Sequence, residues 1–323
     1  MTKSKYASSF LKIAGASFLA LSLAACGTTD SSKSDDKKSS ETTKETRTLT
    51  DAMGNKVEVP VNPKRVLASY LEDNLVALDI TPVAQWSVND GASIQDYLQD
   101  SLKDVPTVNY DLPLESVQEL KPDLIIMDSA SMVEGDKYAQ YKKIAPTYVI
   151  GKDLNNDWRD ELLRVGEVFD KKDEAQAKLD EYDAKSKEAA TTIKEDYNSP
   201  SAAGIWIVGG KAYIVAEELS AGAVMYGDLG MKVPDLVKEV SAKTETNWNE
   251  ISLEKLASLD ADHLFVLNSD GDNDKITTSK IWKAIPAVKA DQVHTFDPTS
   301  SWLYTGTVAN TQIIDDVLES LKK

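Results

Sequence analysis

The chain has 323 residues, and its 36 lysines and arginines against 53 aspartates and glutamates give a formal net charge of −17. This acid excess argues against a nucleic-acid-binding protein, because phosphate recognition depends on clustered basic side chains. One cysteine excludes an internal disulfide framework and a multi-cysteine metal site, and two histidines leave little for a histidine-rich one. With 41 % hydrophobic residues and a length typical of about two domains, the chain has the composition of a folded globule.

Residues 1–25 have the pattern of a secretory signal peptide. Lys3, Lys5 and Lys12 precede an acid-free apolar run at 13–25 that is too short to span a bilayer as a mature helix. The run ends in LAAC at 23–26, which resembles the bacterial lipobox, in which a diacylglycerol is attached to the cysteine. We therefore expect cleavage before Cys26 and lipidation of that residue. The alternative is an ordinary signal peptide with an incidental cysteine.

A flexible tether is expected at residues 26–46. From residue 27 onward this segment contains no apolar side chain, so it cannot bury enough surface to offset the entropy of ordering it. The folded part is therefore expected to begin near Arg47. No later stretch approaches 18 consecutive apolar residues, and the lipid is the only anchor that the sequence predicts.

The folded part alternates apolar runs with helical periodicity, which is typical of α/β proteins. Runs at 66–68, 82–84, 124–127 and 148–150 are predicted strands, and a helix is predicted through 75–78. Near-continuous apolar runs of this kind suit strands that helices cover on both faces.

Three short motifs recur in the same order later in the chain. Leu-Glu at 114–115 and the aspartate at 123 are matched at 253–254 and 262, an offset of 139. The segments at 78–82 and 144–146 have similar counterparts at 229–234 and 285–286. Such matches could also arise because helix–strand units in general share this pattern of residues. We interpret them as two similar α/β lobes, at 47–156 and 171–323, with a ligand cleft between them.

One connecting helix is predicted between the lobes, at 157–170. Its apolar residues Trp158, Leu162, Val165 and Phe169 have helical spacing, and Asp157 can cap the first turn. A second helix with a solvated, charged face is predicted at 173–196. A helical connector is stiff, so we expect the two lobes to be held at a nearly fixed distance.

Catalytic motifs are absent from the sequence. It lacks a nucleophile elbow, a phosphate-binding P-loop and a dinucleotide-binding glycine motif, and we expect no enzyme. Asp270, Asp272 and Asp274 alternate as in a calcium loop, but the turn glycine and closing glutamate of that motif are missing, so this segment is interpreted as a surface loop. His263 and His294 lie in apolar or strand-like runs, and neither a metal site nor a catalytic residue is predicted.

Several motifs carry a family resemblance. They are TDAMG at 50–54, VEVP at 57–60, PKRV at 63–66, ELKPDLII at 119–126, DWR at 157–159 and WKAIPAV at 282–288. Together they resemble the solute-binding lipoproteins of ABC importers, specifically the class for iron–siderophores and cobalamin, whose two lobes are joined by a single rigid helix. The resemblance spans 47–323. It implies a protein without catalysis, anchored on the outer face of the cytoplasmic membrane of a Gram-positive bacterium, and we expect a monomer.

The same resemblance implies a docking role for two glutamates. In that family a glutamate on each lobe docks into arginine pockets of the membrane permease, and the matching positions are Glu115 and Glu254. The alternative is that each carboxylate only complements the positive end of its helix, with Ser252 as the cap of the second helix.

Siderophore pockets combine aromatic side chains with a few polar or basic groups. Open α/β lobes bind ligands at the carboxyl ends of their strands. The candidates at predicted strand ends or in the loops after them are Tyr70, Trp86, Tyr110, Trp206, Tyr213, Trp302 and Tyr304, with Arg159 from the connecting helix. Trp206, inside an apolar run, is the candidate best suited to the core. Trp302 is the candidate least suited to the core, because it follows a turn-rich segment at 297–301.

The scarcity of arginine favours one siderophore class. A trianionic ferric catecholate needs a cluster of basic residues, whereas a nearly neutral ferric hydroxamate can be held by aromatic rings and hydrogen bonds. The only arginines are Arg47, Arg65, Arg159 and Arg164. We therefore predict a ferric hydroxamate whose iron is bound through the siderophore, with no other cofactor. A catecholate, cobalamin or haem binder is the alternative in this class, and a lipid-anchored hydrolase or adhesin is the alternative outside it.

Overall fold

The computed structural model describes residues 45–88, 91, 93–153, 157–244 and 246–322. The predicted signal peptide, the lipidation site at Cys26 and the predicted tether up to residue 44 lie outside the described residues. The first described strand begins at Thr46, one residue before the predicted start of the folded part. None of the helices in the described ranges combines the length and apolar character needed to cross a bilayer.

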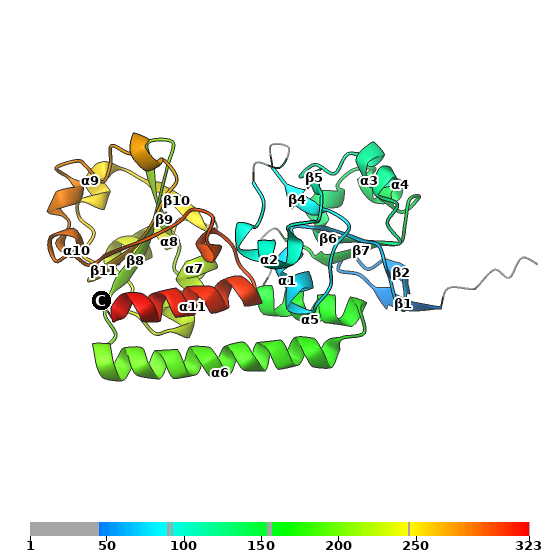
Figure 1. Cartoon of the computed structure of the whole chain (residues 1–323), viewed down its shortest axis with the longest axis horizontal. Coiled ribbons are helices and arrows are strands. Elements are labelled where there is room, and N and C mark those ends of the chain that lie inside the picture. The colour runs from blue at the N-terminus through cyan, green and yellow to red at the C-terminus, as the bar shows by residue number, and fades with distance from the viewer. Residues whose placement is uncertain (1–44, 89–90, 92, 154–156, 245, 323) are drawn as a thin grey trace, which may run out of the picture. The chain divides into compact units, whose positions relative to one another are not determined.

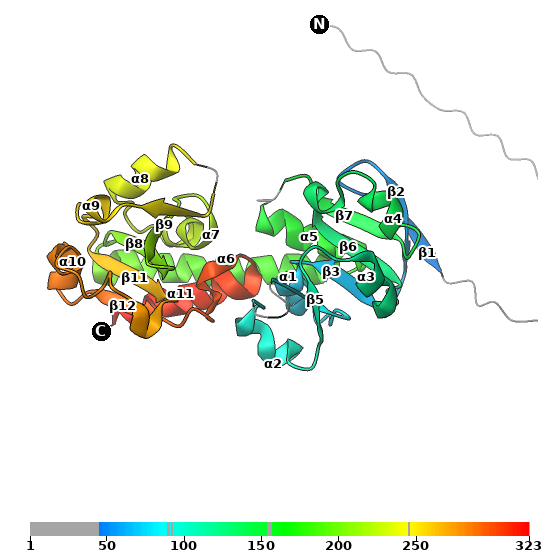
Figure 2. The same ribbon diagram turned by 90° about the horizontal axis from the view of Figure 1, so that it is seen from above.

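The first lobe is built around a parallel sheet of three strands in the order β3-β6-β7 (Figures 1 and 2). All six residues of β6 are buried, as its apolar run predicts for a central strand. An antiparallel hairpin, β1-β2, and a small parallel pair, β4-β5, complete the strands. The elements of this lobe are β1 (Thr46–Thr50), β2 (Lys56–Pro60), β3 (Val66–Ser69), α1 (Glu72–Ala77), β4 (Gln85–Ser87), α2 (Gln99–Leu102), β5 (Thr107–Asn109), α3 (Leu114–Leu120), β6 (Leu124–Ser129), α4 (Lys137–Tyr141), β7 (Thr147–Gly151) and α5 (Trp158–Val168).

The second lobe contains one mixed sheet of five strands in the order β10-β9-β8-β11-β12. Strands β8, β11 and β12 are parallel, and β9 and β10 are added antiparallel. The elements are β8 (Ala202–Val208), β9 (Lys211–Val215), α7 (Ser220–Gly222), the π-helical turn η3 (Ala223–Asp228), α8 (Asp235–Ser241), β10 (Trp248–Ile251), α9 (Leu253–Leu256), β11 (His263–Asn268), α10 (Pro286–Lys289), β12 (Val293–Phe296) and α11 (Thr307–Leu321).

The repeated aspartate has the same structural role in both lobes. Asp123 precedes β6 and accepts the backbone N–H groups of Lys64 (2.9 Å) and Arg65 (2.8 Å), just before the parallel neighbour β3. Asp262 precedes β11 and accepts the N–H of Ser201 (2.8 Å), just before β8. Each carboxylate therefore ties together the starts of two parallel strands, which confirms the predicted similarity of the lobes.

The connecting helix is α6 (Lys172–Tyr197), which packs against α5 of the first lobe and against α11 and η3 of the second (Figures 1 and 2). Its buried residues recur at intervals of three and four, from Ala175 through Tyr182 to Ile193. The predicted connector at 157–170 was therefore wrong. That segment does form a helix, α5, but it ends at Val168 and packs against β7 and α1 of the first lobe.

Candidate ligand-binding site

A cavity of about 340 Å³ lies between the lobes and is lined by residues from both. The first lobe contributes Tyr70 after β3 and Asp73 in α1, and the second contributes Ser220 and Tyr304. This volume lies at the lower end of the usual range for small-molecule sites. A larger depression of about 860 Å³ adjoins it through Glu218, but no aromatic side chain is among the described residues that line it.

An aromatic wall, formed by Tyr70, Trp86, Tyr110 and Tyr304, begins at this cavity. Tyr70 and Tyr304 line the cavity, and Trp86 and Tyr110 extend the wall beyond its lining. The rings of Tyr70 and Trp86 meet edge to face with centroids 4.9 Å apart, and Tyr70 lies 6.4 Å from Tyr304. Trp86 continues the wall to Tyr110 at 6.3 Å and donates its indole N–H to the Tyr110 carbonyl. The Tyr304 hydroxyl donates to the carbonyl of Ile94 across the lobe boundary (2.9 Å). The structure therefore brings together four of the seven aromatic candidates.

Trp206 and Tyr213 are not part of this wall. They lie on β8 and β9 with ring centroids 5.6 Å apart, and Trp206 also contacts Trp248 of β10. The indole N–H of Trp206 donates to the Ser269 hydroxyl. Neither Trp206 nor Tyr213 lines the cavity between the lobes.

The structure contradicts the prediction that Trp302 contacts ligand. Its side chain is fully buried, stacked on Phe265 (5.2 Å) and Phe296 (4.9 Å), and its indole N–H donates to Asp316 (2.8 Å). The turn-rich segment before it suggested an exposed loop, but the chain turns back over β11 and β12 and buries the indole in the core. The next residues, Leu303 and Tyr304, reach the cavity instead.

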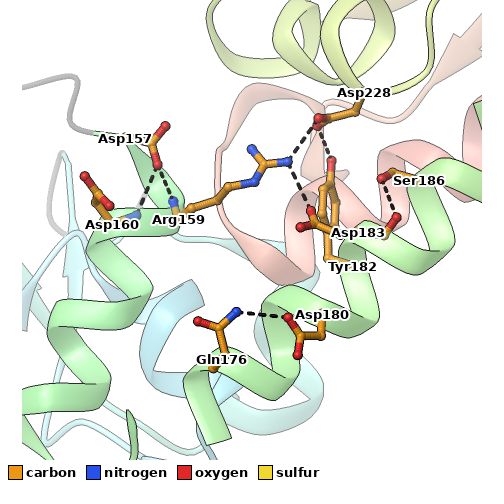
Figure 3. Close-up of polar contacts among 9 residues, drawn as sticks. All are labelled: Asp157, Arg159, Asp160, Gln176, Asp180, Tyr182, Asp183, Ser186 and Asp228. Atoms are coloured by element: carbon orange, nitrogen blue, oxygen red, sulfur yellow. Dashed lines mark hydrogen bonds and ion pairs between the residues drawn. The ribbon is translucent and has the colours of Figure 1, made fainter. Parts of the chain in front are cut away.

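Arg159 lines the cavity, but its guanidinium is already engaged (Figure 3). One terminal nitrogen lies 3.0 Å from Asp228 of η3 and 3.5 Å from Asp183 of α6. The guanidinium carbon lies 4.3 Å from the Trp158 ring centroid. Burial alone would lower the pKa of Arg159, but the charge and hydrogen bond of Asp228 outweigh it, and the pKa is raised. Arg159 therefore joins α5 to the second lobe, and its charge is balanced within the protein.

Helix α1 contains two buried carboxylates, Glu72 and Asp73, of which Asp73 lines the cavity. Asp73 caps the C-terminal helix of the other lobe, accepting the N–H groups of Val308 (3.0 Å) and Ala309 (2.9 Å) of α11. Burial raises the pKa of Asp73 to about 6, although these hydrogen bonds act in the opposite direction. Glu72 accepts the backbone N–H of Trp86 and the side-chain amide of Gln95. Burial raises its pKa to about 7.

Replacing Glu72 by glutamine is expected to change how stability depends on pH. The folded protein still holds a proton on Glu72 at pH values where the unfolded chain, with an ordinary pKa of 4.5, has released it. Folding stability should therefore fall as pH rises from about 4.5 to about 7, by roughly 3 kcal/mol from this group alone. Urea unfolding at a series of pH values should show this fall in the wild type and a smaller one in Glu72→Gln.

The quantity to compare is the slope of unfolding free energy against pH. The glutamine amide can accept only one of the two hydrogen bonds that Glu72 accepts, so the substitution also changes stability by a constant amount at every pH. Asp73 is present in both proteins, so its contribution cancels in the difference. Parallel stability profiles for the two proteins would contradict the assignment.

Several lining residues were not predicted from the sequence. They are Asp73, Asn74, Gln95, Asp128, Glu161, Glu218 and Ser220. One signal was present, because Glu72, Asp73 and Asn74 are consecutive polar residues in a short helix whose other residues are apolar. Their partners lie far away in the sequence, so the pattern alone could not show that they are buried.

Glu115 and Glu254 occupy equivalent positions on the two lobes. Glu115 lies in the first turn of α3 and Glu254 in the first turn of α9, and both are exposed. Ser252 caps α9 by accepting the N–H of Lys255, as predicted. A backbone hydrogen bond and that of Ser252 lower the pKa of Glu254. Each helix therefore presents a carboxylate to solvent.

The two histidines lie side by side on β11 and β12. His263 Nδ1 is 3.0 Å from His294 Nε2, and the rings are stacked. Among the described residues, no group of three or more histidine, cysteine or acidic side chains is placed to hold a metal ion.

Comparisons with known proteins give the family. The sequence profile described as "Periplasmic binding protein" matches residues 70–299, more than half of the chain. This chain belongs to the periplasmic binding protein family. Members of this family bind a solute for transport, so the protein is a binding component and not an enzyme.

Individual relatives cover nearly the whole chain. It is 29 % identical to the probable siderophore-binding lipoprotein YfiY of Bacillus subtilis, over 91 % of this chain and 92 % of that protein. It is 29 % identical to the iron(3+)-hydroxamate-binding protein FhuD of the same organism, over 96 % and 98 %. The structure of Staphylococcus aureus SirA complexed with staphyloferrin B superposes with a TM-score of 0.69 at 29 % identity, covering 86 % of this chain and 99 % of that one. Two α/β lobes joined by one long helix are thus the fold of this periplasmic binding protein.

Proposed function

We propose that this periplasmic binding protein captures an iron–siderophore outside the cell and delivers it to an ABC importer. The names of its relatives support this, since they include a siderophore-binding lipoprotein and a hydroxamate-binding protein that match over nine-tenths of the chain or more. The aromatic wall supports it too, because flat rings pack well against a bulky, partly apolar chelate.

The ligand that we propose is a ferric hydroxamate, and the electrostatics of the cavity carry this choice. Of the described residues that line the cavity, Arg159 is the only one with a cationic side chain. Its guanidinium is already paired with Asp228 and Asp183. A trianionic ferric catecholate or a carboxylate-rich chelate would enter without a compensating positive charge, which is unfavourable in a desolvated cleft. A hydroxamate chelate has no such requirement.

Iron is the cargo in this proposal, held by the oxygen atoms of the siderophore. No protein side chain is needed as an iron ligand, and no further cofactor is part of the proposal. We further propose a monomer anchored through lipid on Cys26 to the outer face of the cytoplasmic membrane of a Gram-positive bacterium. The name of YfiY as a lipoprotein, its source in B. subtilis and the lipobox of this chain support that location.

We propose that Glu115 and Glu254 dock the loaded protein onto the permease. Both carboxylates are exposed and lie on structurally equivalent helices, α3 and α9. Two like acids on two similar lobes suit two like permease subunits that each present a basic pocket.

Titration of tryptophan fluorescence tests the ligand. Ferrichrome or ferrioxamine B should quench the fluorescence in a saturable manner, because Trp158 lines the cavity and the Trp86 ring contacts Tyr70, which also lines it. Trp86→Phe should lose part of the quenching. Trp206→Phe should retain it, because the ring partners of Trp206, Tyr213 and Trp248, do not line the cavity. A ferric catecholate, a citrate chelate, cobalamin or haem that binds when the hydroxamates do not would refute the proposed ligand.

A further inference from the structure

The charge around the cavity is strongly unbalanced. Five carboxylates are among the described lining residues, and they are Asp73, Asp128, Asp157, Glu161 and Glu218. The one guanidinium, that of Arg159, is balanced by two further acids that are not counted among the five. Asp73 and Asp128 are buried, whereas Asp157 and Glu218 are exposed. A cationic group in the cavity is therefore favoured by the excess of carboxylates, and water and salt screen the contribution of the exposed ones.

Three of these five acids hold helix ends or neighbouring strands. Asp73 caps α11, and Asp157 caps α5 by accepting the N–H groups of Arg159 and Asp160. Asp128 accepts the Ser69 hydroxyl at 2.7 Å. Glu161 and Glu218 are contributed by different lobes, the first by α5 and the second by the loop after β9. The two lobes thus each supply one glutamate to the cavity.

Tyr70 lies within this negative field. Desolvation raises the pKa of its hydroxyl, and the charges of Glu72, Asp128 and Glu161 raise it further. The carboxylates are thus close enough to Tyr70 to act on anything held against its ring. Aromatic faces also attract cations, so a positive group against Tyr70 or Tyr304 would interact favourably with both rings and acids.

Two buried polar atoms at the cavity have no hydrogen-bond partner among the residues that the structure describes. The side-chain oxygen of Asn74 and the hydroxyl of Ser220 make no hydrogen bond, and the residues are only 3 % and 6 % exposed. Both residues line the cavity. The side-chain carbonyl oxygen of Asn74 can only accept a hydrogen bond, so a ligand that pairs with it must carry a donor. A protonated amine has three N–H donors.

We propose that the cavity selects ferric hydroxamates that carry a protonated amine over neutral ones, with Glu161 and Glu218 as the specificity-determining carboxylates. This inference rests on the proposed function and narrows the class of ligand from ferric hydroxamates in general to those with a positive charge. The hydroxamate core would pack against the aromatic wall, and the ammonium group would be held by the acids and by the unpaired acceptors.

A matched pair of ligands tests the inference without any change to the protein. Ferrioxamine B carries a free ammonium group, and its N-acetyl derivative has the same iron centre without the charge. Fluorescence titration of the purified protein should give an affinity for ferrioxamine B about tenfold higher than for the acetylated chelate, which corresponds to about 1.4 kcal/mol. The ratio should shrink as salt is added.

Variants assign the preference to the two glutamates. The double substitution Glu161→Gln and Glu218→Gln should bring the affinity ratio close to one. Glu188→Gln, on the exposed face of α6 away from the cavity, removes one charge and should leave the ratio unchanged.

The outcomes separate the two proposals. Equal binding of both chelates by the wild type would overturn the charge selection and leave hydroxamate capture intact. A preference that persists in the double variant would overturn the assignment to these two residues. If neither hydroxamate binds and a ferric catecholate does, the proposed ligand class is wrong and the inference falls with it.

Discussion

Alanine at position 306 is expected to lower the free energy of unfolding by about 3 kcal/mol or more. A Cβ atom on Gly306 would lie 2.3 Å from both Cγ and Oδ1 of Asp73, far inside van der Waals contact. Asp73 cannot move aside, because it is buried and holds the first N–H groups of α11. The φ angle of +155° at Gly306 is one that L side chains rarely adopt, which adds backbone strain. The variant must therefore weaken the cap that links the two lobes.

Urea unfolding of Gly306→Ala against the wild type measures this loss. Gly227→Ala is the matched control, because a Cβ there meets no atom within 4 Å, and its stability should stay within about 1 kcal/mol of the wild type. Hydrogen exchange in α11 should also increase in Gly306→Ala alone. Equal unfolding midpoints for the two variants would show that the close approach of residue 306 to Asp73 does not matter.

Removing both Glu115 and Glu254 is expected to reduce iron–siderophore uptake severely while ligand affinity stays unchanged. Both carboxylates are exposed on α3 and α9, and neither lines the cavity between the lobes. Truncating one partner of a charge pair at an interface typically costs about 2–5 kcal/mol, so loss of two should reduce uptake by at least about tenfold. Uptake of radioactive iron–siderophore into cells, together with fluorescence titration of the purified variant, measures the two effects separately.

The control for the uptake experiment removes the same amount of charge nearby. Glu119→Ala with Asp260→Ala changes two other exposed acids, one on α3 and one shortly after α9. This pair should transport normally. A normal rate in the Glu115 and Glu254 variant, or a weakened affinity for the ligand, would contradict the docking role.

Local sequence patterns were sufficient for much of the fold. The strand at 124–127 and the cap at Asp157 were predicted correctly, because an apolar run and a capping aspartate act within a few residues. The repeat that relates Asp123 to Asp262 was also visible in the sequence, since each aspartate directly precedes a strand. The predicted strand at 82–84 was misplaced, and β4 begins only at Gln85.

Features that depend on distant partners could not be predicted. Two neighbouring helical patterns, in α5 and α6, both suited a connector, and only the packing of α6 on both lobes decides between them. Trp302 was misjudged because Phe265, its stacking partner, is distant in the sequence. The burial of Asp73 and Asp128 at the cavity could not be predicted either, because their partners Val308 and Ser69 are distant in the sequence.

The cap that Asp73 places on α11 has a consequence for how the chain can be divided. An isolated second lobe would lose the carboxylate that caps its last helix, and an isolated first lobe would expose to water the part of α1, including Asp73, that α11 covers. The repeated halves are thus not autonomous modules. The two lobes behave like the subunits of a heterodimer joined in one polypeptide. The stability of each lobe depends on its contacts with the other, so selection for stability acts on both together.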